Sequence, residues 1–320
     1  MTLTWRPLDL ADADAWVRLK AAAEAVDQAN EHFGPADYVD LVGPMDRPAQ
    51  TLGVFDGADL AAYGVIYARR AITDLDLLRL LGGVAPTHRR RGLGRELLTR
   101  LAALALDLHA TRAPGSPVQL LVPVHENNAG HAALATSEGY TPIRWFFDMR
   151  ADLAVLPAQA AVPEGYLLEH YTPDFDDLWR DLRNDTFAEH WGSGPVDAEF
   201  WRAHYVGSEP FVAEHSAHLR DLATGELASF VLSQHYAADA VARGHRELWI
   251  ADVGTRAAHR GRGLAGALLS HVMHAARAEG YATAGLSVDA DNETGALGVY
   301  ERAGFRVTDK WAQHSRVIGA

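Results

Sequence analysis

One cationic, glycine-rich turn occurs twice in the sequence. "HRRRGLGRELL" occupies residues 88–98 and "HRGRGLAGALL" occupies residues 259–269, so His88 and His259 lie 171 residues apart. The offset continues through apolar positions with helical spacing: Leu93, Leu97, Leu98 and Leu101 correspond to Leu264, Leu268, Leu269 and Val272. Half of the 320 residues, about 160, is enough for one hydrophobic core. The repeat therefore predicts two similar domains.

The boundary between the domains is predicted from composition. The stretch "MRADLAVLPAQAAVPEGY", residues 149–166, has an Ala/Pro/Val-rich middle typical of a linker. We therefore expect an N-terminal domain over 1–153, a linker over 154–165 and a C-terminal domain over 166–320. Each half reads as a strand and turn, a helical region, strands, the cationic turn with its helix, and a further strand. This order predicts α/β (α+β) domains with sheets covered by helices.

Composition excludes several classes of function. The chain has no cysteine, so disulfides, thiolate metal sites and a cysteine nucleophile are excluded. A formal net charge of −13 opposes nonspecific binding to nucleic acid or to anionic membranes. The 16 histidines show no metal-site spacing, so no metal is expected. No apolar stretch reaches the ~20 residues of a membrane span, and no signal-peptide pattern is present, which predicts a cytoplasmic protein.

Each cationic turn follows an apolar, strand-like segment and opens a helix. These segments are "LDLLRLLGGVAP" (75–86) and "RELWIADVGTRAA" (246–258). A helix start exposes N–H groups and the positive end of the helix dipole, so arginines there indicate a bound anion. Glycine lets the backbone approach such a ligand closely. Neither turn has the dinucleotide pattern G-x-G-x-x-G or the P-loop pattern G-x-x-x-x-G-K-[ST]. A solvated basic turn is the alternative.

The two turns resemble the pyrophosphate-binding signature [RQ]-x-x-G-x-[GA] of the GNAT (Gcn5-related) N-acetyltransferases. They read Arg89-x-x-Gly92-x-Gly94 and Arg260-x-x-Gly263-x-Ala265. The resemblance implies two tandem GNAT-like domains, each a mixed, mostly antiparallel sheet covered by helices, and acetyl-CoA as the cofactor. It implies cofactor contacts by Val84, Arg89, Arg90, Arg91, Gly92, Leu93 and Gly94 in the first half, and by Val253, Gly254, Thr255, Arg260, Gly261, Arg262, Gly263, Leu264 and Ala265 in the second.

A second block, "LSVDADNETGALGVYERAGF" (286–305), resembles the fifth strand and following helix of the same family. The resemblance implies that the fourth and fifth strands splay apart, with Asn292 near the cofactor and Tyr300 near its sulfur. The corresponding segment of the first half, "HENNAGHAALATSEGY", has Ala135 in the place of the tyrosine, and Leu81 stands in the place of Asp252. We therefore expect a catalytic C-terminal half and a non-catalytic N-terminal half.

Direct transfer of an acetyl group to an amine requires a proton acceptor for the attacking ammonium and a donor for the departing thiolate. Tyrosine, with a reference pKa of about 10, can protonate or hydrogen-bond a thiolate, so Tyr300 is the candidate acid. A tyrosine that only packs in the core is the alternative. Asp252 and Glu247 are the candidate bases, but a regular strand would put them on opposite faces. A bulge would change this, and a water could also relay the proton.

The acceptor region is predicted around "FAEHWGSG" (187–194), where Glu189, His190 and Trp191 occupy the place at which the family builds its acceptor pocket. Packing at a helix end is the alternative for this segment. The sequence therefore predicts an acetyl-CoA-dependent N-acetyltransferase that acts on a primary amine of a small molecule. A catalytically silent acyl-CoA-binding regulatory protein is the alternative, and nucleic-acid binding by the arginine turns is a third reading.

Overall fold

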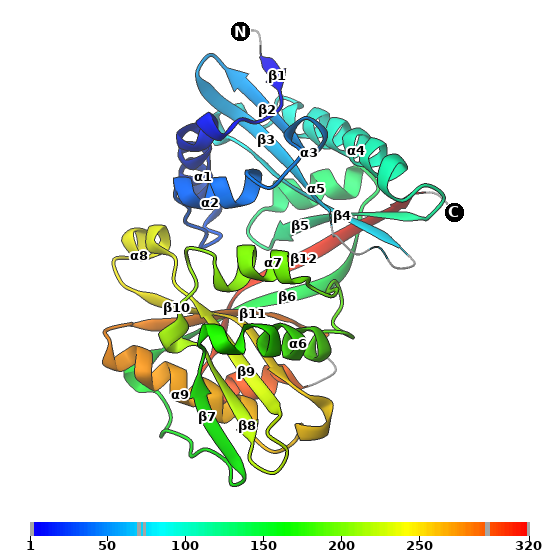
Figure 1. Ribbon diagram of the computed structural model, residues 1–320. Coiled ribbons are helices and arrows are strands. Elements are labelled where there is room, and N and C mark those ends of the chain that lie inside the picture. Colours follow the sequence, from blue (N-terminus) through cyan, green and yellow to red (C-terminus); the bar gives the residue numbers. More distant parts are fainter. Residues whose placement is uncertain (1–2, 69–71, 73–74, 292–294, 319–320) are drawn as a thin grey trace. The chain divides into compact units, whose positions relative to one another are not determined.

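The computed structural model describes residues 3–68, 72, 75–291 and 295–318. They form two compact units, the first made of Met1–Trp145 and Asp309–Ala320 and the second of Phe146–Thr308 (Figure 1). These units differ from the predicted domains, because residues 146–153 belong to the second unit and residues 309–320 to the first. The Ala/Pro/Val-rich composition marks an exposed connection, whereas pairing between distant strands decides which unit a strand belongs to.

The sheet of the first unit has the strand order β1-β2-β3-β4-β5-β12. β4 and β5 pair in parallel, and the other neighbours pair antiparallel. The strands are β1 (Thr4–Arg6), β2 (Thr51–Asp56), β3 (Asp59–Ala68), β4 (Asp76–Val84), β5 (Val118–His125) and β12 (Arg306–Ile318). The helices are α1 (Ala13–Asp27), α2 (Pro35–Val42), α3 (Arg47–Gln50), α4 (Leu93–Arg112) and α5 (Ala129–Ser137).

The sheet of the second unit has the order β6-β11-β10-β9-β8-β7, with β10 and β11 parallel. The strands are β6 (Thr141–Asp152), β7 (Tyr166–His170), β8 (Ala217–Asp221), β9 (Leu227–Gln234), β10 (Glu247–Thr255) and β11 (Thr283–Asp289). The helices are α6 (Asp176–Thr186), α7 (Ala198–Trp201), α8 (Ala237–Arg243), α9 (Leu264–Ala278) and α10 (Ala296–Arg302). Mixed, mostly antiparallel sheets in both units confirm the predicted fold class.

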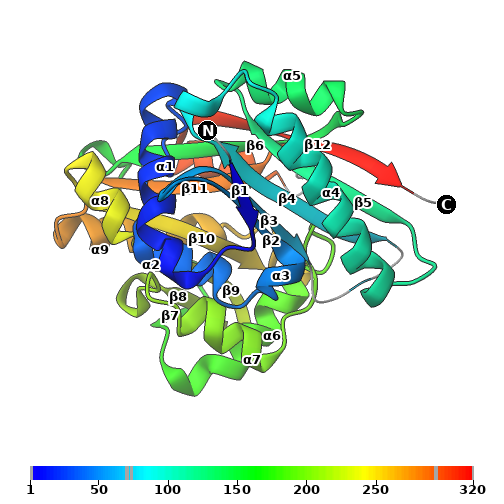
Figure 2. The same cartoon turned by 90° about the horizontal axis from the view of Figure 1, so that it is seen from above.

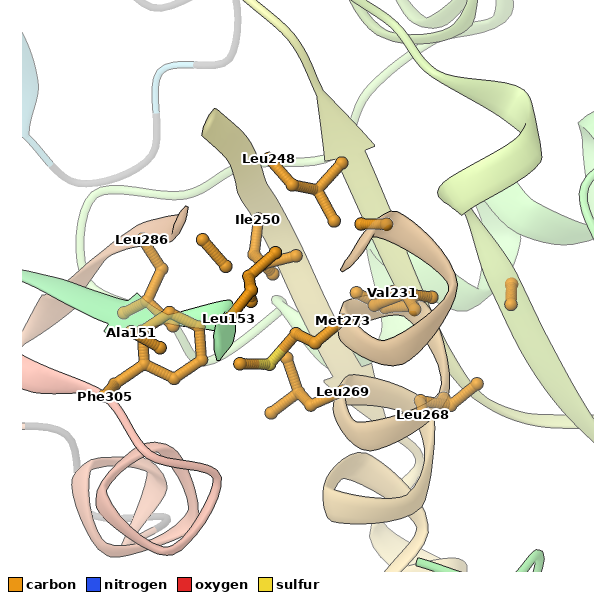
Figure 3. Close-up of a cluster of buried hydrophobic side chains, with 14 of the residues drawn as sticks. Ala151, Leu153, Val231, Leu248, Ile250, Leu268, Leu269, Met273, Leu286 and Phe305 are labelled. Carbon is orange, nitrogen blue, oxygen red and sulfur yellow. The ribbon is translucent and has the colours of Figure 1, made fainter. Parts of the chain in front are cut away.

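Helices cover both faces of each sheet. In the first unit α1 and α4 both contact β3 and β4 (Figure 2). Side chains alternate between the two faces of β3. Tyr63 packs in the hydrophobic cluster that contains residues of α1, and Ile66 packs in the cluster that contains residues of α4. In the second unit Leu269 and Met273 of α9 pack on β10 and β11 (Figure 3). Trp179 of α6 packs in a separate cluster with β9.

The parallel strand pair diverges in both units. Pairing of β4 with β5 covers only Asp76–Arg79, although β4 continues to Val84. Pairing of β10 with β11 covers only Glu247–Ile250, although β10 continues to Thr255. The splayed strands implied by the family resemblance are therefore present twice. The second half of each central strand has one strand neighbour among the described residues.

The chain's final strand completes the sheet of the first unit. Residues Trp311–Ile318 of β12 pair with His125–Val118 of β5. Beyond Leu121, β5 no longer pairs with β4, so β12 is the strand neighbour described for this part of β5. None of the helices within the described ranges is long and apolar enough to cross a membrane.

Ending the chain at Thr308 should therefore destabilise the first unit. The amides of 122–125 would lose their strand partner, and we expect their hydrogen exchange to accelerate by ~10²-fold or more. Hydrogen-exchange mass spectrometry of the shortened chain measures this, with β9 of the second unit as the internal control. Unchanged protection of β5 would contradict the assignment of residues 309–320 to the first unit.

Candidate active site

The cationic turn of the second unit leaves backbone N–H groups open to a ligand. Gly261 and Gly263 have φ angles of +77° and +79°, which glycine adopts without strain. A Cβ at either position would meet no atom within 4 Å, so both glycines border open space. Gly263 is the N-cap of α9, and no side chain caps this helix. The first N–H groups of α9 can therefore bind an anion.

Hydrogen bonds from two arginine side chains hold this turn against neighbouring strands. Arg260 Nε donates to the carbonyl oxygen of Thr255 at 3.2 Å, and within the described part of the chain its terminal nitrogens have no partner. Arg262 donates to the hydroxyl oxygen of Tyr166 at 2.9 Å, and this hydroxyl also hydrogen-bonds His259 Nδ1 at 2.8 Å. Arg262 is thus tied to β7, whereas the guanidinium end of Arg260 stays available to an anion.

The turn of the first unit has the same shape with different partners. Arg89 Nε donates to the carbonyl oxygen of Val84 at 2.9 Å, as Arg260 does to Thr255. Its two terminal nitrogens, however, bind both carboxylate oxygens of Asp27 at 2.6 and 2.7 Å. The terminal donors of Arg89 are therefore already used by a carboxylate of the same chain, whereas those of Arg260 are not.

Several residues expected to contact the cofactor are described as follows by the structure. Leu93 and Leu264, expected among the cofactor contacts, are the first residues of α4 and α9, and both side chains are buried in core clusters. Only their backbone N–H groups are placed to meet a ligand. Arg90 holds a left-handed conformation with φ of +62°, which is uncommon for a residue with a side chain. Asn292 lies outside the described residues.

A bulge in β10 decides the orientation of the candidate bases. Ile250 pairs with Ser233 and Asp252 pairs with Leu232, so Ala251 is an extra residue on β10. An extra residue shifts the alternation of side chains by one position from that point onward. The alternation argument for opposite faces therefore fails here.

After the bulge, Asp252 and Glu247 lie on the same face of β10. Leu248 and Ile250 face the core formed with α9, so Glu247 faces the opposite side of the sheet. Asp252 also faces that side, because its carboxylate lies 3.8 Å from Arg183 of α6.

The two carboxylates differ in their partners. Glu247 is buried and accepts hydrogen bonds from Arg150 Nε at 3.1 Å and from Thr283 Oγ1 at 3.0 Å. The Asp252 side chain is 15% exposed, and its Oδ2 has no hydrogen-bond partner within the described part of the chain. Burial raises the pKa of Asp252 to about 6, against the opposing effect of the positive charge on Arg183. Glu247 therefore ties strands together, and Asp252 is the carboxylate able to accept a proton.

Tyr300 is electrostatically coupled to this carboxylate. It lies on α10, and its ring centroid is 6.1 Å from that of Phe305. Burial, together with the negative charge of Asp252, raises the pKa of Tyr300 to about 12. Tyr300 therefore keeps its proton at neutral pH and can donate a hydrogen bond. Asp252 and Tyr300, both predicted as site residues from the sequence, are thus linked by this charge effect, and their catalytic roles stay predictions.

Arg183 lies beside Asp252, and sequence reasoning missed it. Its side chain is 9% exposed, and it follows the buried residues Trp179 and Leu182 on α6. The spacing of four residues from Trp179 puts Arg183 on the buried face of a helix. This spacing is the feature that could have revealed it, because a charge on an apolar face is uncommon.

The predicted acceptor segment follows α6 directly. The His190 ring lies 5.4 Å from Phe187, and the Trp191 ring lies 6.1 Å from Phe146. Glu189 is exposed. Arg183 contacts the end of the segment at Ser193 and Gly194. The roles of Glu189, His190 and Trp191 in binding an acceptor stay predictions.

Comparisons with known proteins agree with this geometry. The chain matches the acetyltransferase (GNAT) family over residues 176–305, within its C-terminal half. It is 30% identical over 316 residues to the mycothiol acetyltransferase of Clavibacter michiganensis subsp. michiganensis, covering 94% of each chain. It is 28% identical over 330 residues to the mycothiol acetyltransferase of Parafrankia sp., covering 95% of each chain.

Solved structures show the same fold over the whole chain. A GCN5-related N-acetyltransferase from Sphaerobacter thermophilus matches with a TM-score of 0.80 and 25% identity, covering 99% of this chain and 96% of that one. A tandem GNAT protein from the clavulanic acid biosynthesis pathway matches with a TM-score of 0.76 and 19% identity, covering 100% and 99%. The chain belongs to the GNAT acetyltransferase family and is an acyltransferase with two GNAT folds in tandem.

Asp252→Asn should alter the pH dependence of stability. The folded-state pKa of Asp252, about 6, exceeds the ordinary value of about 3.9 expected in the unfolded chain, so wild type loses stability as the pH rises between these values. A pKa difference of about 2 corresponds to roughly 3 kcal/mol. Asparagine cannot ionise. The free energy of unfolding of the variant, relative to wild type, should therefore rise by up to this amount between about pH 4 and pH 7.5.

Urea denaturation at the two pH values measures this change. Asp177→Asn, at an exposed aspartate of the same unit, is the matched control and should show little pH-dependent difference. A pH-independent difference for Asp252→Asn would show that Asp252 has an ordinary pKa in the folded protein.

Proposed function

We propose that the protein is an acetyl-CoA-dependent N-acetyltransferase that acetylates a primary amine of a small molecule, with the chemistry in its C-terminal half. Two observations beside the splayed strands carry the proposal: the contact of Arg183 with Asp252, and the effect of the Asp252 charge on Tyr300. In the first half the places of Asp252 and Tyr300 hold Leu81 and Ala135, which have no group for proton transfer. The proposed assignment of catalysis to one half rests on this difference.

The residues of the second unit fit acetyl-CoA. Open N–H groups at the start of α9, with Gly261 and Gly263, suit a pyrophosphate, and Arg260 adds a positive charge beside them. The backbone of 251–255 lies beyond the last pair of β10 with β11, so its free edge suits the amides of an extended arm. Bound acetyl-CoA would supply an acetyl group activated as a thioester.

Asp252 is the proposed base. With a pKa of about 6 it is mostly ionised at neutral pH, yet it binds a proton more readily than an ordinary aspartate. The carboxylate of Asp252 would accept the proton of the attacking amine, because neither of its oxygens has a hydrogen-bond partner within the described residues. Glu247 is not proposed as the base, since Arg150 and Thr283 hold its carboxylate.

Tyr300 is the proposed partner of the departing thiolate. A pKa of about 12 makes full proton transfer to a thiolate of pKa about 8.5 unfavourable, so hydrogen bonding from the hydroxyl is its main contribution while Asp252 is charged. Burial is the larger cause of the raised pKa of Tyr300 and remains, but once Asp252 has taken the proton of the amine, the second cause, its negative charge, is gone. Tyr300 then becomes a stronger acid at the stage when the thiolate leaves.

The relatives named mycothiol acetyltransferase suggest the first acceptor to test. Mycothiol synthase, a tandem GNAT enzyme, acetylates the cysteinyl amine of a pseudodisaccharide, and we propose this amine as the specific candidate. One departure from that enzyme is that Trp249 stands where its fourth strand carries a carboxylate. In this chain Asp252, turned toward α6 after the bulge, would take over the role.

Gly263→Val should abolish acetyl-CoA binding in the C-terminal half. Valine is strained at a φ of +79°, and its side chain would fill the space that the pyrophosphate needs. Isothermal calorimetry with acetyl-CoA measures the loss, expected to be ~10²-fold or more in affinity. Gly92→Val, at the equivalent glycine of the first unit, is the matched control and should keep the binding that Gly263→Val loses. Tight binding by Gly263→Val, with Gly92 also replaced, would sink the proposed site.

Tyr300→Phe should lower kcat by ~10²-fold while the KM for acetyl-CoA changes little, because the lost hydroxyl acts mainly in the transition state. Steady-state kinetics with the cysteinyl amine substrate measures both constants. Tyr171→Phe, which removes a hydroxyl hydrogen-bonded to Asp176 in the same unit, is the matched control. If Tyr300→Phe turns over at the wild-type rate and product release is not limiting, Tyr300 has only a packing role.

A further inference from the structure

Arg183 is a charged side chain almost removed from water. A buried guanidinium is costly unless its hydrogen-bond donors and its charge are satisfied. Nη1 donates to the carbonyl oxygen of Gly194 at 2.7 Å, and Nη2 donates to Ser193 Oγ at 3.0 Å. The guanidinium carbon also lies 5.1 Å from the ring centre of Phe187 and 5.5 Å from that of Tyr205. Arg183 is therefore held by the segment that follows α6.

The remaining nitrogen, Nε, faces Asp252 without bonding it. Nε and Asp252 Oδ2 lie 3.8 Å apart, which is within ion-pair range but beyond hydrogen-bond length. Both atoms are buried, and neither has a hydrogen-bond partner within the described ranges. Arg183 thus supplies a positive charge beside Asp252 and leaves the lone pairs of Oδ2 free.

Other arginine–carboxylate pairs of the chain are built differently. Arg89 binds both oxygens of Asp27 at 2.6 and 2.7 Å, and Arg150 donates to Glu247 at 3.1 Å. Direct hydrogen bonds of this kind occupy lone pairs of the carboxylate oxygens, which are then not available to a substrate. At the longer Arg183–Asp252 distance, the positive charge of Arg183 still acts on Asp252, but no hydrogen bond forms between them.

The first unit offers an internal comparison. In α1, Lys20 follows Trp16 by four residues, as Arg183 follows Trp179 in α6. Both tryptophans are buried. Lys20 bonds Glu31 at 2.7 Å, and β4 has Leu81 in the place of Asp252. A cation occurs at this helix position in both halves, but only in the second unit does the described structure direct it toward the central strand.

We propose that Arg183 is a positioning residue of the acetyl transfer, which keeps Asp252 ionised without bonding its proton-accepting oxygen and holds the acceptor segment at Ser193 and Gly194. One guanidinium thereby sets the distance between the base and the segment predicted to bind the amine. The inference rests on the proposed function. It adds a residue that lies outside the family signature and outside the repeated cationic turn.

Few charged or titratable groups surround Asp252. Arg183 faces it from α6, and Tyr300 of α10 is coupled to it. The strand partner on β9 is Leu232, which carries no charge. Glu247 of the same strand is neutralised by Arg150. Removal of the charge on Arg183 should therefore have a large effect on the ionisation of Asp252.

The experiment measures the titration of Asp252 directly in the full chain without substrate. Carboxyl carbons of ¹³C-labelled aspartate are followed by NMR against pH, and Asp252→Asn identifies the resonance. Arg183→Gln should raise the midpoint of Asp252 by one pH unit or more, a change of ~10-fold in the acid dissociation constant. Arg183→Lys keeps the positive charge and should stay close to wild type. Arg150→Gln, which removes a charge from Glu247 in the same unit, should leave Asp252 unchanged.

Hydrogen exchange of the same variants tests the second part of the proposal. Both Arg183 variants lose the pair of hydrogen bonds that the guanidinium donates to Ser193 and Gly194. Amides of 187–196 should therefore exchange faster by ~10-fold in both variants. If Arg183→Gln does not fold, Arg183→Lys still tests the proposal. In that variant the titration midpoint of Asp252 should stay close to wild type while the amides of 187–196 exchange faster. An unchanged midpoint in folded Arg183→Gln, or a lysine variant shifted as far as the glutamine variant, would overturn it. Because no substrate is present, these outcomes are distinct from a failure of acetyl transfer itself.

Discussion

Backbone hydrogen bonding along two short parallel strand pairs governs the architecture of this protein. In each unit the central pair is joined for four residues and then separates, so the second half of the central strand has a free edge. A free edge needs a partner, because buried peptide groups without hydrogen bonds are costly. The splayed edge, the glycine turn and the helix start follow one another along the chain. A ligand with an amide-bearing arm and an anionic end would satisfy them in turn.

The two units place different side chains on the same scaffold. Their turns hold the same backbone contact, from arginine Nε to the carbonyl at the end of the central strand. The first unit satisfies its arginine with Asp27 and has Leu81 on the strand. The second unit leaves Arg260 open and keeps Asp252 partly unsatisfied, at a cost in stability.

Much of the fold could be predicted from the sequence, because the repeated turn and the helical spacing after it are local patterns. Asp252 was predicted from its place on the strand before the turn, and Tyr300 from its place in the second family block. Alternation could not choose between Asp252 and Glu247, since the bulge at Ala251 arises from pairing with β9. The domain bounds differed for a similar reason: local composition does not record which distant strand a segment joins. Arg183 was missed because its partner lies about 70 residues away in the sequence, beyond the reach of local patterns.

The exchange of end segments between the units has a consequence for synthesis on the ribosome. Residues 309–320 belong to the first unit, although they are made after the whole of the second unit. The second unit, Phe146–Thr308, has its complete strand set before those residues emerge. Chains fold as they are extended, so the earlier half must wait with β5 only partly paired while the later half can already close. The order of completion is thus the reverse of the order of translation, and the nascent first unit is the one that needs protection from aggregation.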